Sequence, residues 1–169
     1  NYARAHVGLA LLWAGRQQMG FLPPAESAPK AKAAALRAVE LDDTLAEAHY
    51  VLAIVYTWSD WNWPAGESEF RRAIQLNPGF AAHAHYATLL NIMRRPDEAM
   101  AEARRALELD PFNTLVRAVY GANLVFIRQY DAAIAEFNKV LATNPRDLAA
   151  LSNLISAHHQ KREYKQALE

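Results

Sequence analysis

A proline that recurs at nearly constant spacing restricts the fold of this chain more than any other feature. Asn77-Pro78, Asp110-Pro111 and Asn144-Pro145 lie thirty-three and thirty-four residues apart. Each follows a stretch whose apolar residues have helical spacing, and proline cannot continue a helix because it lacks an amide proton and its ring clashes with the preceding turn. The spacing predicts a repeated unit of about 34 residues that ends in a helix.

Other residue types recur with the same period. Residues 114–147 carry the pattern most fully, with Arg117, Tyr120-Gly121, Leu124, Ala133, Phe137, Val140 and Pro145. Residues 80–113 repeat it with His83, Tyr86-Ala87, Leu90, Ala99, Ala103, Ala106 and Pro111. Residues 46–79 repeat it with His49, Leu52-Ala53, Tyr56, Gly66, Phe70, Ala73 and Pro78, provided that the turn holds one extra residue. Small residues allow two helices to approach closely and large ones fill the remaining space, so each unit is predicted to be a helical hairpin.

The two terminal units depart from this pattern. In residues 3–45 the first helix is expected around His6 and Trp13 and the second around Ala31 to Ala38. Between them, Gly20 to Ser27 contains Pro23-Pro24 and is predicted to form a long inter-helix loop. Residues 148–169 begin a further unit that is cut off in its second helix.

These positions resemble the tetratricopeptide (TPR) repeat, whose signature is Trp, Leu-Gly, Tyr, Ala, Phe, Ala and Pro at the same offsets. The resemblance implies an all-α fold, a TPR-type α-solenoid of about five helical hairpins in a right-handed superhelix. Residues 1–169 would form a single solenoid with repeats at approximately 3–45, 46–79, 80–113, 114–147 and 148–169. The pentatricopeptide RNA-binding repeat has a similar period, but the Asp/Asn-Pro pairs and the paired alanines favour the tetratricopeptide interpretation.

A narrower resemblance covers Ala31–Asp42, Leu45–His49, Asp60–Trp63 and Glu69–Ile74. These segments resemble the C-terminal TPR region of bacterial multidomain signalling proteins, in which an adenylate cyclase, a Ser/Thr kinase or a winged-helix regulator lies upstream. The resemblance implies a regulatory role in a bacterial cytoplasm. The chain begins with Asn1 rather than Met, and we expect it to be a piece of a longer polypeptide.

Composition excludes several classes of function. Eighteen Lys and Arg balance eighteen Asp and Glu, so no long-range field attracts nucleic acid or anionic lipid. The chain has no cysteine, and no apolar run approaches the roughly 18 residues of a membrane span. We therefore expect a cytoplasmic protein that binds neither nucleic acid nor membrane.

Catalytic and metal-binding residues are not expected. His6, His49 and His83 occupy the same position of their units, which predicts a packing role at the contact between helices. No two histidines have the i, i+4 spacing of helical metal sites, and no nucleophile–base pair or phosphate loop can be assembled. The sequence predicts no enzyme activity, no metal and no cofactor.

The resemblance places a binding groove along the first helix of each hairpin. The candidate groove residues are Tyr50, Ile54, Trp58, Ala84, Thr88, Asn91, Ile92, Ala118, Ala122, Val125 and Phe126. The same register adds Val7, Leu11 and Ser156. The family's carboxylate clamp needs Lys and Asn here, and the mostly apolar residues exclude it.

An apolar groove predicts a protein or peptide partner, such as an amphipathic helix or a hydrophobic segment. The alternative function is homo-oligomerisation, in which the chain would form a homodimer of the parent protein. A third function, RNA binding by a helical repeat, is the last alternative. The other candidate surface is the Phe21–Pro24 loop.

Overall fold

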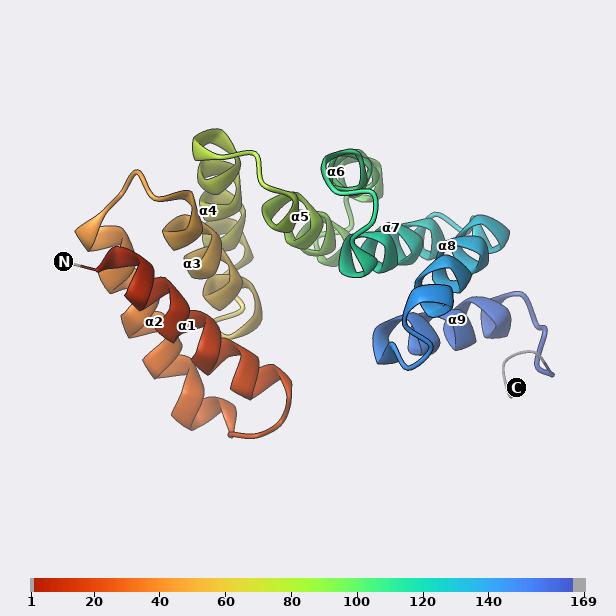
Figure 1. Cartoon of the computed structure of the whole chain (residues 1–169), viewed down its shortest axis with the longest axis horizontal. Helices are drawn as coiled ribbons and strands as arrows, with labels where there is room; N and C mark the ends of the chain where they lie inside the picture. The colour runs from red at the N-terminus through yellow and green to blue at the C-terminus, as the bar shows by residue number, and fades with distance from the viewer. Residues whose placement is uncertain (1, 166–169) are drawn as a thin grey trace. The chain divides into compact units, whose positions relative to one another are not determined.

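The computed structural model describes residues 2–165, which contain nine α-helices and no β-strand (Figure 1). The helices are α1 (Ala3–Gln18), α2 (Pro24–Leu41), α3 (Ala46–Trp58), α4 (Trp63–Leu76), α5 (Phe80–Ile92), α6 (Pro96–Leu109), α7 (Thr114–Phe126), α8 (Tyr130–Thr143) and α9 (Leu148–Gln160). The predicted all-α fold is confirmed for these residues. The chain divides into two compact units, residues 1–82 and 83–169.

The recurring proline pairs act as predicted at the helix ends. Helices α4, α6 and α8 each end at the residue directly before Asn77-Pro78, Asp110-Pro111 and Asn144-Pro145. A polar side chain soon after two of these pairs begins the next helix. The Asn113 side chain accepts hydrogen bonds from the amides of Leu115 and Val116, and the Asp147 side chain accepts one from Ala150. The segment that ends one repeat therefore also starts the next.

The turns inside the hairpins have a common geometry. The turn between α3 and α4 covers residues 59–62, one residue more than turns 93–95 and 127–129, which confirms the predicted insertion. In the turns after α3, α5, α7 and α9, one residue is left-handed without being glycine, whereas the turn after α1 has Gly20 in this conformation. The non-glycine residues are Trp61, Arg94, Arg128 and Arg162, with φ between 55° and 64°. Such a residue lets the chain reverse direction within three or four residues.

The hairpin of α1 and α2 corrects one expectation from the sequence. Gly20 to Ser27 was expected to be a long loop, but α2 already begins at Pro24. The additional residues instead lengthen the helices, to 16 in α1 and 18 in α2, against 13 in α3. Proline is tolerated in the first helical turn, where its missing N–H would have no partner, so Pro23-Pro24 starts a helix instead of excluding one.

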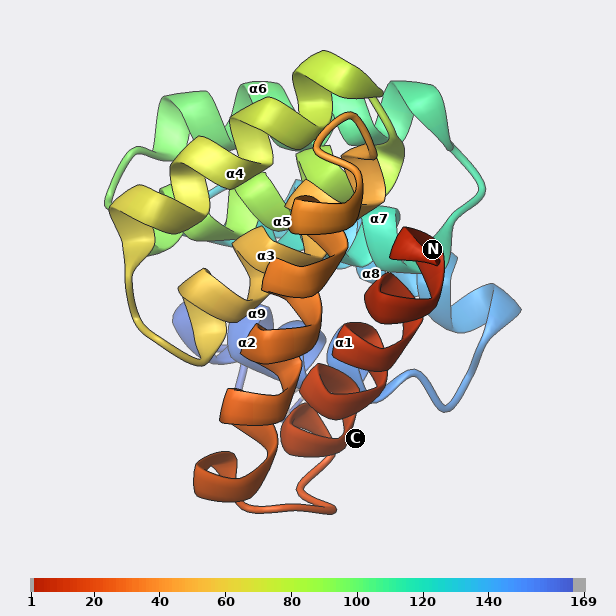
Figure 2. The same ribbon diagram turned by 90° about the vertical axis from the view of Figure 1, so that its left-hand side faces the viewer.

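The first unit is built around α3. Figures 1 and 2 show α1 and α2 running antiparallel side by side, and α3 packs against both of them and against α4. Small residues permit this close packing: Ala35, Ala38 and Ala53 are fully buried. Gly66 of α4 lies against Thr57 and the carbonyl oxygen of Ala53, so no larger residue fits there.

The second unit has its core where α8 packs against α7 and α9. One cluster of this core contains Met100, Leu124, Ala133, Phe137 and Ala157, all buried. A second cluster joins Ala118, Val140 and Ala150. The residues that recur with the repeat period thus form the core of each hairpin.

Candidate functional site

In three of the hairpins, a histidine or arginine early in the first helix contacts a glutamate on the second helix. In α3 and α4, His49 Nδ1 lies 2.6 Å from Glu69 Oε2, and its Nε2 lies 2.9 Å from the backbone oxygen of Asp43. In α5 and α6, His83 Nδ1 lies 2.5 Å from Glu102 Oε2. Both histidines are buried, so these rings lie at the helix contact that the sequence assigned to them.

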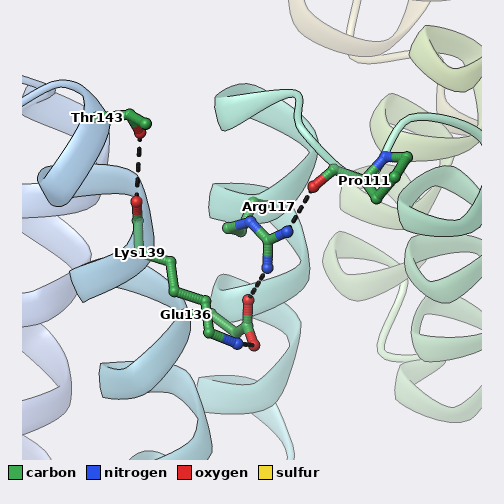
Figure 3. Close-up of polar contacts among 5 residues, drawn as sticks. All are labelled: Pro111, Arg117, Glu136, Lys139 and Thr143. Carbon is green, nitrogen blue, oxygen red and sulfur yellow. Dashed lines mark hydrogen bonds and ion pairs between the residues drawn. The ribbon is translucent and has the colours of Figure 1, made fainter.

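Arg117 occupies the same position in α7 (Figure 3). Its Nη1 donates to Glu136 Oε2 on α8 at 2.5 Å, and Nη2 donates to the backbone oxygen of Pro111. Glu136 also accepts a hydrogen bond from Lys139 at 2.6 Å. Burial alone would raise the pKa of Glu136, but the hydrogen bonds from Lys139 and Arg117 outweigh burial and lower it.

Each of these three pairs joins the two helices of its hairpin. Sequence reasoning missed the glutamate partners, although Glu69, Glu102 and Glu136 recur with the repeat period and could have been found from it. Among the described residues, no group of three His, Cys, Asp or Glu side chains could hold a metal ion. No helix in residues 2–165 has the length and apolarity needed to cross a membrane.

The first unit contains a hollow of about 200 Å³ beside α1 and α3. Its lining comprises Val7, Leu11, Ala46, Glu47, Tyr50, Ala73, Asn77, Gly79, Ala81 and Ala82. Three of these, Val7, Leu11 and Tyr50, belong to the groove register predicted from the sequence. Glu47 is the single charged residue of this lining, and it is exposed. The hollow therefore offers an apolar surface with one carboxylate beside it.

Two aromatic residues of α3, Tyr50 and Trp58, pack against Phe70 of α4. The Tyr50 ring lies 6.3 Å from the Phe70 ring, and the Trp58 ring lies 6.2 Å from it edge-on. Burial raises the pKa of the Tyr50 phenol to about 12. Tyr50 thus presents an uncharged aromatic wall to the hollow. Ile54 is only 7% exposed and lies outside the lining.

The second unit contains a hollow of about 350 Å³ between α7 and α9. Its lining comprises Ala122, Val125, Phe126, Arg128, Tyr130, Asn153, Ser156 and Gln160. Three predicted groove residues of α7 therefore meet at one place, and Phe126 is 63% exposed. The opposite wall from α9 is polar, so this lining is mixed and not mostly apolar as expected. The repeat register indicated Ser156, but it gave no signal for Arg128 or Gln160.

The remaining predicted groove residues differ in how deeply they are buried. Ala84 and Ala118 are buried, and Ala118 packs against Val140 and Ala150. Asn91 donates from Nδ2 to Asn123 Oδ1 at 2.6 Å, and Thr88 donates to the backbone oxygen of Ala84 at 3.2 Å. Ile92 is partly exposed. The groove as a binding surface remains a prediction. Leu11 and Phe126 are its exposed apolar members, at 40% and 63%, and Tyr50, Ile92 and Val125 are partly exposed.

No family model matches the chain, and no curated protein sequence does. Solved structures do match it over nearly the whole length. PilF of Pseudomonas aeruginosa is 23% identical and superposes with a TM-score of 0.77, covering 98% of this chain and 71% of PilF. PilW, a type IV pilus biogenesis factor, is 22% identical, with a TM-score of 0.77 over 95% of this chain and 72% of PilW.

YrrB, described as a TPR protein with an unusual peptide-binding site, is 22% identical, with a TM-score of 0.63 over 94% of this chain and 79% of YrrB. The chain has the tetratricopeptide-repeat fold. In terms of this fold, His49, His83 and Arg117 occupy the position of the signature tryptophan, and Gly66 and Gly121 are the close-approach positions of their hairpins.

Proposed function

We propose that this tetratricopeptide chain is a non-catalytic module that binds an apolar segment of a protein, either an extended peptide, a helix or a partner domain. The observation that carries the proposal is the hollow of the first unit, with Val7, Leu11 and Tyr50 in its lining. An apolar hollow with few polar groups gains free energy by enclosing an apolar side chain. The peptide-binding site named for YrrB supports the same class of function.

The lining also suggests the chemistry of the bound segment. The hollow is suited to one large apolar side chain, and Glu47 is an exposed carboxylate at its edge. A Lys or Arg next to the apolar anchor would complement that carboxylate, at a contribution of about 0.2–1 kcal/mol for an exposed pair. The preferred partner is therefore an apolar residue with a basic neighbour.

The wider setting rests on the sequence. The resemblance of residues 31–74 to the C-terminal region of bacterial multidomain signalling proteins supports a regulatory role in the cytoplasm of a bacterium. In that setting the module would recruit a partner to an output domain in the same polypeptide.

The proposal can be tested by selecting peptides from a random phage-displayed library on the purified chain and titrating the enriched peptides by calorimetry. We expect the enriched peptides to share a large apolar residue. Leu11→Asp should weaken their binding by about tenfold or more, because it places a carboxylate in the hollow. Leu36→Asp is the matched control on α2, outside the lining, and should change binding by less than about twofold.

Two outcomes would contradict the proposal. One is a selection that enriches no common apolar residue. The other is a set of peptides that bind the Leu11→Asp and Leu36→Asp variants equally well.

A further inference from the structure

The hollow of the second unit has the opposite charge to the hollow of the first. Arg128 is the single charged residue of its lining, whereas the first hollow has Glu47. The other lining residues are apolar on α7 and polar on α9. An anionic group that enters the second hollow therefore meets a cation and no carboxylate of the lining.

The guanidinium of Arg128 is not neutralised by the chain itself. It forms no ion pair with any carboxylate within residues 2–165, and Arg128 is exposed. The acidic residues closest to the lining in sequence are Asp131 and Glu163, and both lie 2.6 Å from the ammonium group of Lys161. These two carboxylates are thus satisfied elsewhere, and the charge of Arg128 faces solvent at the hollow.

The turn that carries Arg128 does not need its side chain. Arg128 is left-handed, with φ of 62°, a conformation that glycine adopts without strain. Backbone bonds alone close this turn, from the amide of Arg128 to the oxygen of Val125 and from the amide of Gln129 to the oxygen of Leu124. Replacing Arg128 by glycine should therefore remove the charge and preserve the fold.

An exposed aromatic ring lies on the apolar side of the same hollow. Phe126 is 63% exposed, and Ala122 and Val125 share its face of α7 at helical spacing. A large apolar side chain of a ligand gains free energy by covering this ring. Because Phe126 and Arg128 line one hollow of about 350 Å³, the apolar side chain and the anionic group of a ligand should be neighbours.

The polar wall on α9 matches the backbone of a peptide better than it matches a chain end. Asn153, Ser156 and Gln160 lie three and four residues apart and so share one helix face. The Asn153 side chain is held on this face, because its Nδ2 donates to the backbone oxygen of Ala149 at 2.8 Å. Amide and hydroxyl side chains both donate and accept, as backbone amides do, whereas a terminal carboxylate only accepts. The wall therefore favours an internal segment.

We propose that the second hollow binds an internal segment of a partner protein in which an aspartate or glutamate stands next to a large apolar residue. Arg128 donates hydrogen bonds to the carboxylate, the apolar side chain covers Phe126, and the α9 wall pairs with the backbone of the segment. The inference rests on the proposed function in one respect, that the chain is a protein-binding module. The first hollow favours a basic neighbour of the apolar residue, so the two hollows select different segments.

The test is an NMR titration of the isotope-labelled chain with short capped peptides. The probes are acetyl-Gly-Phe-Glu-Gly-amide and the same peptide with Gln or Lys in place of Glu. We expect the Glu peptide to shift the backbone amides of Val125 and Ser156, with a Kd of about millimolar. The Gln and Lys peptides should bind about fivefold or more weakly. Equal binding of the three peptides overturns the proposal, and so do shifts confined to Tyr50 in the first hollow.

A fourth probe separates an acidic side chain from a chain end. Acetyl-Gly-Gly-Phe with a free terminal carboxylate places its only anionic group after the aromatic residue. We expect it to bind more weakly than the Glu peptide, because the α9 wall then lacks a backbone to pair with. Tighter binding of this probe overturns the internal segment.

Two glycine variants test the role of Arg128 without risk to the fold. Arg128→Gly should leave the melting temperature unchanged or raise it, and should weaken the Glu peptide by about fivefold or more. Arg94→Gly is the matched control, because it makes the same change of charge at an exposed, left-handed turn position outside the lining. It should leave binding of the Glu peptide unchanged. Equal weakening by both variants, or no weakening by Arg128→Gly, overturns the proposal.

The same measurements distinguish this inference from the proposed function. If library peptides depend on Leu11 while the Glu peptide ignores Arg128, the proposed function stands and this inference falls. If the Glu peptide depends on Arg128 while library peptides ignore Leu11, the second hollow is supported and the first is not a binding site.

Discussion

Gly121 of α7 lies directly against the aromatic ring of Phe137 on α8. A Cβ atom at position 121 would be 2.6 Å from Cε1 of that ring, which is well inside contact distance. Phe137 is fully buried and cannot move away without disturbing the core of the second unit. The absence of a side chain at this position therefore sets how closely α7 and α8 pack.

The first prediction is that Gly121→Leu destabilises the chain by about 1–3 kcal/mol through overpacking. Gly8→Ala is the matched control, because a Cβ there meets open space and the helix should become about 0.5–1 kcal/mol more stable. Urea unfolding followed by circular dichroism measures both changes. An unchanged midpoint for Gly121→Leu would contradict the close contact.

The second prediction is that replacing arginine by glycine affects stability differently at Arg94 and at Arg104. It is left-handed in the turn after α5, with φ of 58°, a conformation that glycine adopts without strain. Arg94→Gly should therefore be neutral or stabilise by up to about 1 kcal/mol. Arg104→Gly, in the middle of α6, should destabilise by about 1 kcal/mol. Thermal unfolding of both variants tests this, and equal losses at both positions would contradict the turn geometry.

A third prediction concerns acid stability and follows from the lowered pKa of Glu136. A carboxylate whose pKa is lower in the folded state stabilises the fold above its unfolded pKa, and this contribution disappears as the pH falls through the folded value. Glu136→Gln should be less stable than wild type at pH 7, by about 1 kcal/mol, and the difference should shrink below about pH 4. Chemical unfolding at several pH values measures the difference. A constant gap between the two proteins would show that ionisation of Glu136 is not involved.

A fourth prediction concerns the stability of the fold at alkaline pH and follows from Tyr50. Burial raises the pKa of its phenol from 10.0 to about 12. Because the unfolded chain ionises first, stability is complete below about pH 10 and should fall as the pH rises toward 12, by about 2–3 kcal/mol in total. Tyr50→Phe should remove this part of the alkaline loss. Unfolding experiments between pH 9 and 12 on both proteins decide whether the loss belongs to Tyr50.

The sequence predicted the helical hairpins because their determinants are local. The pairs such as Asp110-Pro111 end helices by backbone chemistry alone, and the small residue at Gly121 follows from the helix spacing. The loop before α2 was assigned wrongly, because Pro23-Pro24 can either break a helix or begin one, and the choice depends on tertiary packing. The buried hydroxyl of Ser27 donates to the Pro23 backbone oxygen at 3.0 Å within that first turn.

The candidate site was predicted less completely than the fold. Register identifies which residues share a helix face, so it placed Ala122, Val125 and Phe126 together. It does not tell which of them a neighbouring helix covers. Asn91 was placed in the groove, but its amide donates the buried hydrogen bond to Asn123, a residue 32 positions away in sequence on α7. The register likewise could not predict that polar residues of α9 form one wall of the hollow, because this depends on how α9 packs beside α7.

The last prediction tests the groove on the second unit. Ile92 of α5 is partly exposed and Phe126 of α7 is 63% exposed, so neither is fully enclosed in the core. Fully burying one such side chain against a partner contributes roughly 1.5–3 kcal/mol. Ile92→Asp with Phe126→Asp should therefore weaken the binding of a selected peptide by about tenfold or more, with little change in the melting curve. Calorimetry and thermal unfolding of the double variant measure the two effects separately. The matched control is Leu109→Asp, at the exposed end of α6, which should change neither. If the double variant unfolds, these positions belong to the core; if it binds as wild type does, the partner uses the hollow beside Tyr50 or the segment from Phe21 to Pro24 instead.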